Sequence, residues 1–106
     1  MENQTIVSQA TPLGQSSVAV IRLSGPSSFS IAKKLTGTKK NRTHHEVALL
    51  LIRNNEGVSL DRGLFTFFAS PNSYTGEDIV EISCHGNQLV VGIIINRCIK
   101  LGARIA

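Results

Sequence analysis

The chain has 106 residues, 42% hydrophobic and 17% charged, a size and composition that fit one soluble globular domain with its own core. The net charge of +4 is compatible with an anionic partner, but the basic residues are spread along the sequence, with one cluster at residues 39–42. No apolar run is long enough to span a membrane, and the first residues lack the features of a signal or transit peptide, so we expect a cytoplasmic protein.

The first part of the chain predicts two strands. Residues 5–9 form a short strand, and residues 18–23 are a β-branched run typical of a central strand covered on both faces. Arg22 interrupts this run, and an arginine in so apolar a strand must reach water, pair with a carboxylate or contact a ligand. Glu81 is one candidate partner. The loop between the strands, residues 11–17, lacks the Gly-Lys-Ser/Thr ending of a nucleotide-binding P-loop.

A helix and a hairpin follow. The helix is predicted over residues 26–36, because Pro26 suits the first helical position and Gly37 suits the end. Residues 47–52 and 58–68 have the composition of strands, and a turn rich in asparagine and glycine joins them.

Around this hairpin, we expect the polar side chains to lie on the surface and the aromatic side chains to lie in the core. His44 and His45 are adjacent in an extended segment and point to opposite sides, so we interpret them as surface residues rather than ligands of one metal. The basic cluster at residues 39–42 has no aromatic residues between its charges, which favours a solvated loop over an RNA-binding surface. The phenylalanines expected in the core are Phe65, Phe67 and Phe68.

After Asp78 the pattern has the period of a strand. Glu81 lies in the middle of this strand, a costly position unless its carboxylate faces water or binds a partner with hydrogen-bond donors. Cys84 and Cys98 lack a Cys-x-x-Cys spacing and occur in apolar patterns, so we interpret them as buried reduced thiols. The two faces of the strand are Ile79, Glu81 and Ser83 against Val80, Ile82 and Cys84.

Residues 87–101 predict a helix, with Asn87 as the N-cap and Gly102 just past the end. Its polar stripe is thin, so we expect most of it to be buried against the sheet or another subunit. A further strand begins at Ala103. The element order indicates the α+β (mixed α/β) class, with a mixed β-sheet of about five strands and two or three helices. The residues of the polar stripe are Gln88, Gly92, Asn96 and Lys100.

The most distinctive motif spans residues 72–86. It reads Asn-Ser-Tyr-Thr-Gly-Glu-Asp, followed by Glu81 and by His85-Gly86. With this motif, the chain from residue 5 to residue 106 resembles the N-terminal domain of the MnmE (TrmE) family of bacterial tRNA-modification GTPases. The loop at residues 11–17 carries the family's Thr-Pro-x-Gly but departs from its usual residues at Leu13, Ser16 and Ser17.

The resemblance implies a fold similar to the tetrahydrofolate-binding domains of aminomethyltransferases. It implies that the ligand is 5-formyltetrahydrofolate or a related one-carbon tetrahydrofolate, and it places the family's folate-contacting arginine at Arg22 and its glutamate at Glu81. It implies no metal site in this chain. The single domain of residues 1–106 is expected to form a homodimer.

For the complete protein, the resemblance implies a potassium-stimulated GTPase that works with the flavoprotein MnmG. Together they make 5-carboxymethylaminomethyluridine at the wobble position of tRNA, and the folate supplies the one-carbon unit. The helical and GTPase domains, which hold GTP, magnesium and potassium, are expected outside these 106 residues. We therefore expect this chain to bind folate and dimerise without catalysing the reaction.

Two other functions stay open. One is a stand-alone aminomethyltransferase-like enzyme, for which the sequence offers no clear catalyst, because Glu77-Asp78 are loop neighbours and Cys84-His85 alternate across a strand. The other is an RNA-binding module that uses the loop at residues 39–42, whose affinity would fall steeply with salt.

Overall fold

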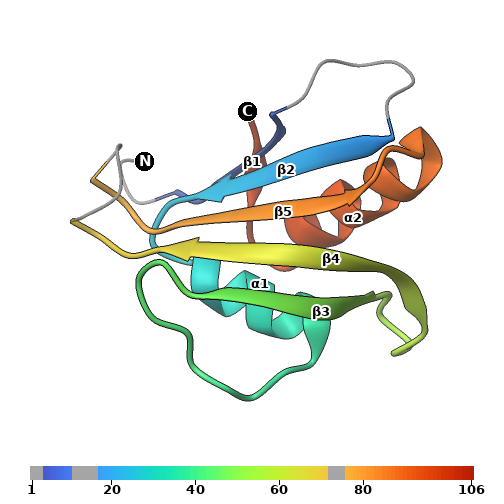
Figure 1. Ribbon diagram of the computed structural model, residues 1–106. Helices are drawn as coiled ribbons and strands as arrows, with labels where there is room; N and C mark the ends of the chain where they lie inside the picture. Colours follow the sequence, from blue (N-terminus) through green and yellow to red (C-terminus); the bar gives the residue numbers. More distant parts are fainter. Residues whose placement is uncertain (1–3, 11–16, 72–75) are drawn as a thin grey trace.

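The computed structural model describes residues 4–10, 17–71 and 76–106. These residues form one six-stranded sheet with two helices, and Figure 1 looks onto the face of the sheet that lies away from the helices. The predicted α+β class with a mixed sheet is confirmed. The strands are β1 (Ile6–Gln9), β2 (Val18–Ser24), β3 (Val47–Arg53), β4 (Ser59–Phe68), β5 (Ile79–His85) and β6 (Arg104–Ile105), and the helices are α1 (Ser28–Thr36) and α2 (Gln88–Lys100).

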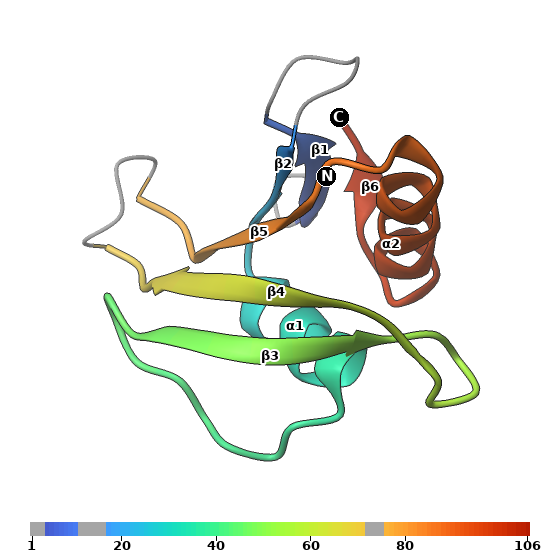
Figure 2. The ribbon, with the colours of Figure 1, turned by 45° about the vertical axis from the view of Figure 1, so that its right-hand side comes forward.

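The strands lie in the order β3-β4-β5-β2-β1-β6. Every neighbouring pair is antiparallel except β1 and β6, which run parallel at one edge. The sheet twists so strongly that β3 and β4 cross the direction of β1 and β2 in the turned view (Figure 2). The pairing of β2 with β5 at the centre sets Arg22 directly opposite Glu81.

The two faces of the sheet have different environments. Both helices pack on one face, and the side chains of β2 and β5 that point toward them are fully or almost fully buried. The alternation predicted for β5 is confirmed. The prediction that β2 is covered on both faces is wrong, because no helix in the described part of the chain covers the other face, where Val18 is 51% exposed. The core residues of these strands are Ala19, Ile21, Leu23, Val80, Ile82 and Cys84.

Helix α1 begins two residues later than predicted. Pro26 precedes the helix, Ser27 is the N-cap residue, and Gly37 ends the helix in the left-handed conformation, as expected. The start is fixed by Ser28, whose buried hydroxyl donates to the carbonyl oxygens of Gly25 (2.8 Å) and Asp78 (3.1 Å). These bonds tie the beginning of α1 to the segment that leads into β5.

Helix α2 has the predicted N-cap. The side chain of Asn87 accepts hydrogen bonds from the backbone N–H groups of the next turn, and Gly102 follows the helix with a φ of 123°. The predicted polar stripe is exposed, but the helix is less buried than expected, because Leu89 (73%) and Ile93 (39%) also face outward.

The two adjacent histidines do not point to opposite sides as predicted, although His45 is exposed as predicted and His44 is half-buried. The rings of His44 and His45 stack on one another with centroids 3.9 Å apart and planes inclined by 27°. They share one side because the chain turns at His45, which has a φ of 63° and is therefore not extended. Among the phenylalanines, Phe65 and Phe67 are buried in the core as predicted, whereas Phe68 is only half-buried.

The turn between β2 and α1 depends on a glycine at a close approach between two segments. Gly25 has a φ of 136°, and a Cβ placed there would lie 2.6 Å from the Cα of Thr5. We expect Gly25→Ala to lower the free energy of unfolding by at least about 2 kcal/mol, because backbone strain and a steric clash add. Gly57→Ala is the matched control: its φ of 81° is also positive but nothing lies within 4 Å, so the cost should be about 1 kcal/mol. Urea denaturation measures both, and equal effects would contradict the role of close packing.

Candidate functional site

Arg22 and Glu81, the two residues singled out from the sequence, form an ion pair on the uncovered face of the sheet. The Nε and NH2 groups of Arg22 both donate to Oε2 of Glu81, at 3.0 Å and 2.7 Å. The pair exists because the two residues are directly opposite in the central β2–β5 ladder, where their side chains leave the sheet on the same side.

This pair contributes little to stability. The side chains of Arg22 and Glu81 remain 36% and 25% exposed, and an ion pair open to solvent to this extent stabilises a protein by about 1 kcal/mol or less. Its position in the centre of the sheet therefore suits recognition better than folding. A carboxylate that accepts N–H groups lies next to a guanidinium that donates to oxygen, an arrangement that can bind a planar heterocycle carrying both kinds of group.

The direct neighbours of the pair on the uncovered face are polar, because Ser8 lies opposite Arg22 and Thr66 lies opposite Glu81, and the apolar residues lie farther along the strands. Toward one end of β2 and β5 lies an open hollow of about 440 Å³ between strands β2 to β5. Leucine and valine side chains supply most of its wall, and Arg62, Ser83 and His85 supply the polar groups. The exposed apolar residues on this face are Val18 (51%), Val47 (54%), Leu49 (61%) and Leu64 (43%).

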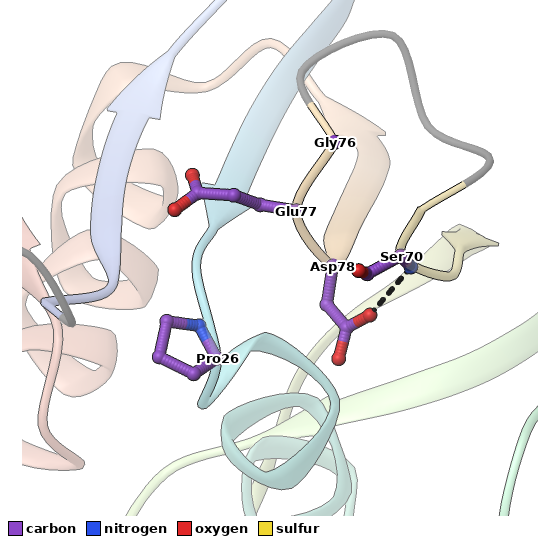
Figure 3. A pocket seen from close by; sticks show the side chains of 5 residues that line it. All are labelled: Pro26, Ser70, Gly76, Glu77 and Asp78. Atoms are coloured by element: carbon purple, nitrogen blue, oxygen red, sulfur yellow. Dashed lines mark hydrogen bonds between the residues drawn. The ribbon is translucent and has the colours of Figure 1, made fainter.

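The part of the sequence motif that the structure describes lines a second hollow, of about 270 Å³, at the other end of β5 (Figure 3). The backbone N–H of Ser70 donates to Asp78 at 2.8 Å, and the hydroxyl of Ser24 donates to Glu77 at 3.3 Å. The two carboxylates point in different directions from adjacent positions, so they do not form a pair suited to acid–base catalysis. The predicted motif residues 72–75 and the loop residues 11–16, including Leu13 and Ser16, lie outside the described residues.

The structure also reveals a polar pair between β4 and the end of β5 that the sequence did not predict. Asp61 of β4 accepts a hydrogen bond from the backbone N–H of His85 at 3.0 Å and contacts the Nδ1 atom of its ring at 2.7 Å. Burial alone would raise the pKa of Asp61, but the backbone and ring of His85 outweigh burial and hold that pKa below its ordinary value. Asp61 and His85 are separated by 24 positions in the sequence, so only the register between β4 and β5 shows that they are neighbours.

The two cysteines behave as predicted. Both are free thiols in the interior, and burial raises the pKa of Cys84 to about 11 and that of Cys98 to about 12. Cys84 faces the core whereas His85 faces outward, so the two side chains do not form a thiol–imidazole pair. In the described ranges, no three histidine, cysteine or acidic side chains converge as metal ligands, and neither helix is long and apolar enough to span a membrane.

The Asp61–His85 contact predicts a specific pH dependence. Because the pKa of Asp61 is lowered by folding, its contribution to stability is present above the ordinary value of 3.8 and is lost as the pH falls below that value. We expect Asp61→Asn to cost about 1 kcal/mol at pH 7, and the difference from the wild type to shrink in acid. Urea denaturation at a series of pH values measures this difference. Glu56→Gln, in the exposed β3–β4 turn, should leave the curve unchanged, and a D61N difference that grows in acid would refute the assignment.

Comparison with known proteins identifies the family. The family model described as "GTP-binding protein TrmE N-terminus" matches residues 5–106. Three proteins called tRNA modification GTPase MnmE illustrate the similarity. The chain is 45% identical to the protein of Helicobacter pylori over 104 residues, which is 98% of this chain and 23% of that protein. It is 44% identical to that of Francisella philomiragia, with 96% and 22% covered, and 45% identical to that of Akkermansia muciniphila, with 94% and 23% covered.

The chain thus spans about 23% of the length of the curated relatives it matches. The match extends over β1 to β6 and includes both Arg22 and Glu81. Because the family model covers nearly all of the sequence, the chain belongs to the TrmE N-terminal family.

Proposed function

We propose that this chain is the folate-binding and dimerisation domain of a tRNA-modification GTPase. The observation that carries the proposal is the Arg22–Glu81 pair at the centre of an uncovered sheet face. The relatives named tRNA modification GTPase MnmE support the tRNA-related part. Folate as the ligand follows from what the resemblance of the sequence to this family implies for Arg22 and Glu81.

The side chains of the pair fit the chemistry of a one-carbon tetrahydrofolate. The pterin ring carries an amino group and ring N–H groups, from which a carboxylate can accept hydrogen bonds. It also carries a carbonyl oxygen, to which a guanidinium can donate. Glu81 would accept hydrogen bonds from the amino and N–H groups, and Arg22 would donate hydrogen bonds to the carbonyl oxygen. When bound, 5-formyltetrahydrofolate or a related folate supplies the one-carbon unit, and the residues of this chain hold and orient it.

The uncovered face also supports homodimerisation. Its exposed valines and leucines form an apolar surface toward one end of the strands that carry the charged pair, and burying such a surface against a second copy is favourable. A partner placed there would reduce the exposure of Arg22 and Glu81 and strengthen their hydrogen bonds to a ligand.

The remaining steps belong to the complete protein in this proposal. GTP hydrolysis, with magnesium and potassium, takes place in domains outside these residues. The flavoprotein MnmG is the partner with which the dimer makes 5-carboxymethylaminomethyluridine in tRNA. This chain contributes folate and the dimer contact, and no catalytic residue is assigned to it.

The folate site predicts a difference between two glutamates. We expect Glu81→Gln to weaken the binding of 5-formyltetrahydrofolate by about 10- to 100-fold, because a charge-assisted hydrogen bond is lost. Glu77→Gln is the control. Glu77 lies near the start of the same strand, but its carboxylate accepts a hydrogen bond from Ser24 and is not part of the Arg22–Glu81 pair. Calorimetric titration of the protein measures both affinities. Unchanged affinity in E81Q, or an equal loss in both variants, would remove the site from this pair.

The dimer surface predicts a difference between two exposed leucines. We expect Leu49→Glu, on the uncovered face, to convert a dimer into a monomer because a charge would be buried in the contact. Leu89→Glu, on the outer side of α2, should leave the dimer intact although Leu89 is the more exposed residue. Light scattering gives the mass in solution. A dimer that is lost in L89E and kept in L49E would place the contact on the helices instead.

A further inference from the structure

One segment accounts for the net positive charge of the chain. Residues 33–46 contain five of the 11 lysines and arginines and only one of the seven acidic residues, so they carry a net charge of +4. This equals the net charge of the whole chain, and the rest of the sequence is balanced. The segment comprises the last turn of α1 and the connection to β3, on the side of the sheet where β3 forms the edge.

Hydrogen bonds hold the charged groups of this segment together. The ammonium group of Lys33 donates to Asn41 at 2.8 Å, which joins the end of α1 to the loop. Lys40 and Arg42 both contact Oε2 of Glu46, at 3.4 Å and 2.9 Å. The hydrogen bond from Arg42 is the largest of the causes that lower the pKa of Glu46 to about 2, so this carboxylate stays ionised and keeps the cations in place.

An aromatic stack with one exposed ring, that of His45, lies at the end of this segment. The ring of His45 stacks on that of His44 and meets the edge of Phe68, with the His45 and Phe68 centroids 5.7 Å apart. His45 is exposed, and Glu46, which binds the cations, is the next residue in the chain. The sequence pattern contained no aromatic residues between the basic ones, but the fold supplies them at the end of the loop.

Hydrogen bonds anchor the turn that carries the two histidines. The N–H of His45 donates to the carbonyl of Phe67 at 2.7 Å, and the ring of His44 accepts from the N–H of Ala69 at 2.9 Å. His45 has a φ of 63°, in the left-handed region that residues with a Cβ adopt at a cost. A strained but well-anchored residue that exposes its ring at the end of a basic segment indicates a binding surface.

We propose that residues 33–46 together with Phe68, here called the basic loop surface, bind single-stranded RNA. Lysine side chains contact the phosphates, and an unpaired base stacks on the exposed ring of His45. This combination favours RNA over an anionic membrane, which would need the charges but not the exposed aromatic ring. The inference goes beyond the proposed folate and dimer functions and does not involve Arg22 or Glu81, so the two can fail separately.

The test compares two fluorescent probes of about ten nucleotides by anisotropy: a single-stranded RNA and an abasic ribose-phosphate strand with the same number of charges. We expect the wild-type protein to bind the RNA at least about fivefold more tightly than the abasic strand, because stacking adds to the phosphate contacts. His45→Asn should abolish this difference, since asparagine tolerates a positive φ but has no ring. His45→Phe should retain it, which separates loss of stacking from loss of the loop structure.

Charge is tested with two matched double variants. Lys39→Gln/Lys40→Gln should reduce the slope of log affinity against log salt by about 1.4, the value for two phosphate contacts with a single strand. Lys100→Gln/Arg104→Gln removes equal charge from α2 and β6, away from the β3 edge, and should leave the slope unchanged. Equal binding of both probes, an unchanged affinity of H45N, or equal effects of the two double variants would overturn the proposal. Binding to vesicles of anionic phospholipid but not to the RNA probe would overturn it in favour of a membrane contact.

Discussion

The antiparallel pairing of β2 with β5 is the constraint on which the rest of the structure depends. It joins the first part of the chain to the last part through seven residue pairs, and its register decides which side chains meet on each face. On one face it aligns the core residues under the helices. On the other it places Arg22 opposite Glu81, and a shift of the register by one residue would turn one of these two side chains into the core. The fold and the candidate site are therefore set by the same hydrogen-bond ladder.

Much of this arrangement could be predicted because the signals are local. The alternation around Glu81, the capping side chain of Asn87 and the left-handed Gly37 each depend on a few neighbouring residues. The position of Arg22 as a site residue came from family resemblance, and its approach to Glu81 was one of several open alternatives. The ladder selects between these alternatives, since a strand pairing across 59 positions fixes which partner is within reach.

The features that could not be predicted depend on distant parts of the chain. The one-sided covering of β2 follows from where the helices pack, and a β-branched run has the same composition whether one face or both are covered. The Asp61–His85 contact requires the β4–β5 register. The stacking of His44 on His45 requires a positive φ at a residue that seldom adopts one, and the anchors for that turn are Phe67 of β4 and Ala69, which follows β4. These three misses concern a site or a surface, whereas the misassigned Phe68 concerns the border of the core.

The parallel pairing of β1 with β6 has a consequence for how the protein folds. Residue 6 lies beside residue 104, and the N–H of Arg104 and of Ala106 donate to the carbonyls of Thr5 and Val7. These contacts bridge almost the largest sequence separation that the chain offers, whereas the β3–β4 hairpin closes over a short turn. Loop-closure entropy delays such distant contacts, so the hairpin can form early while the β1 edge of the sheet closes last. During synthesis, β1 can pair with β2 first, and its other edge stays unpaired until β6 has been made.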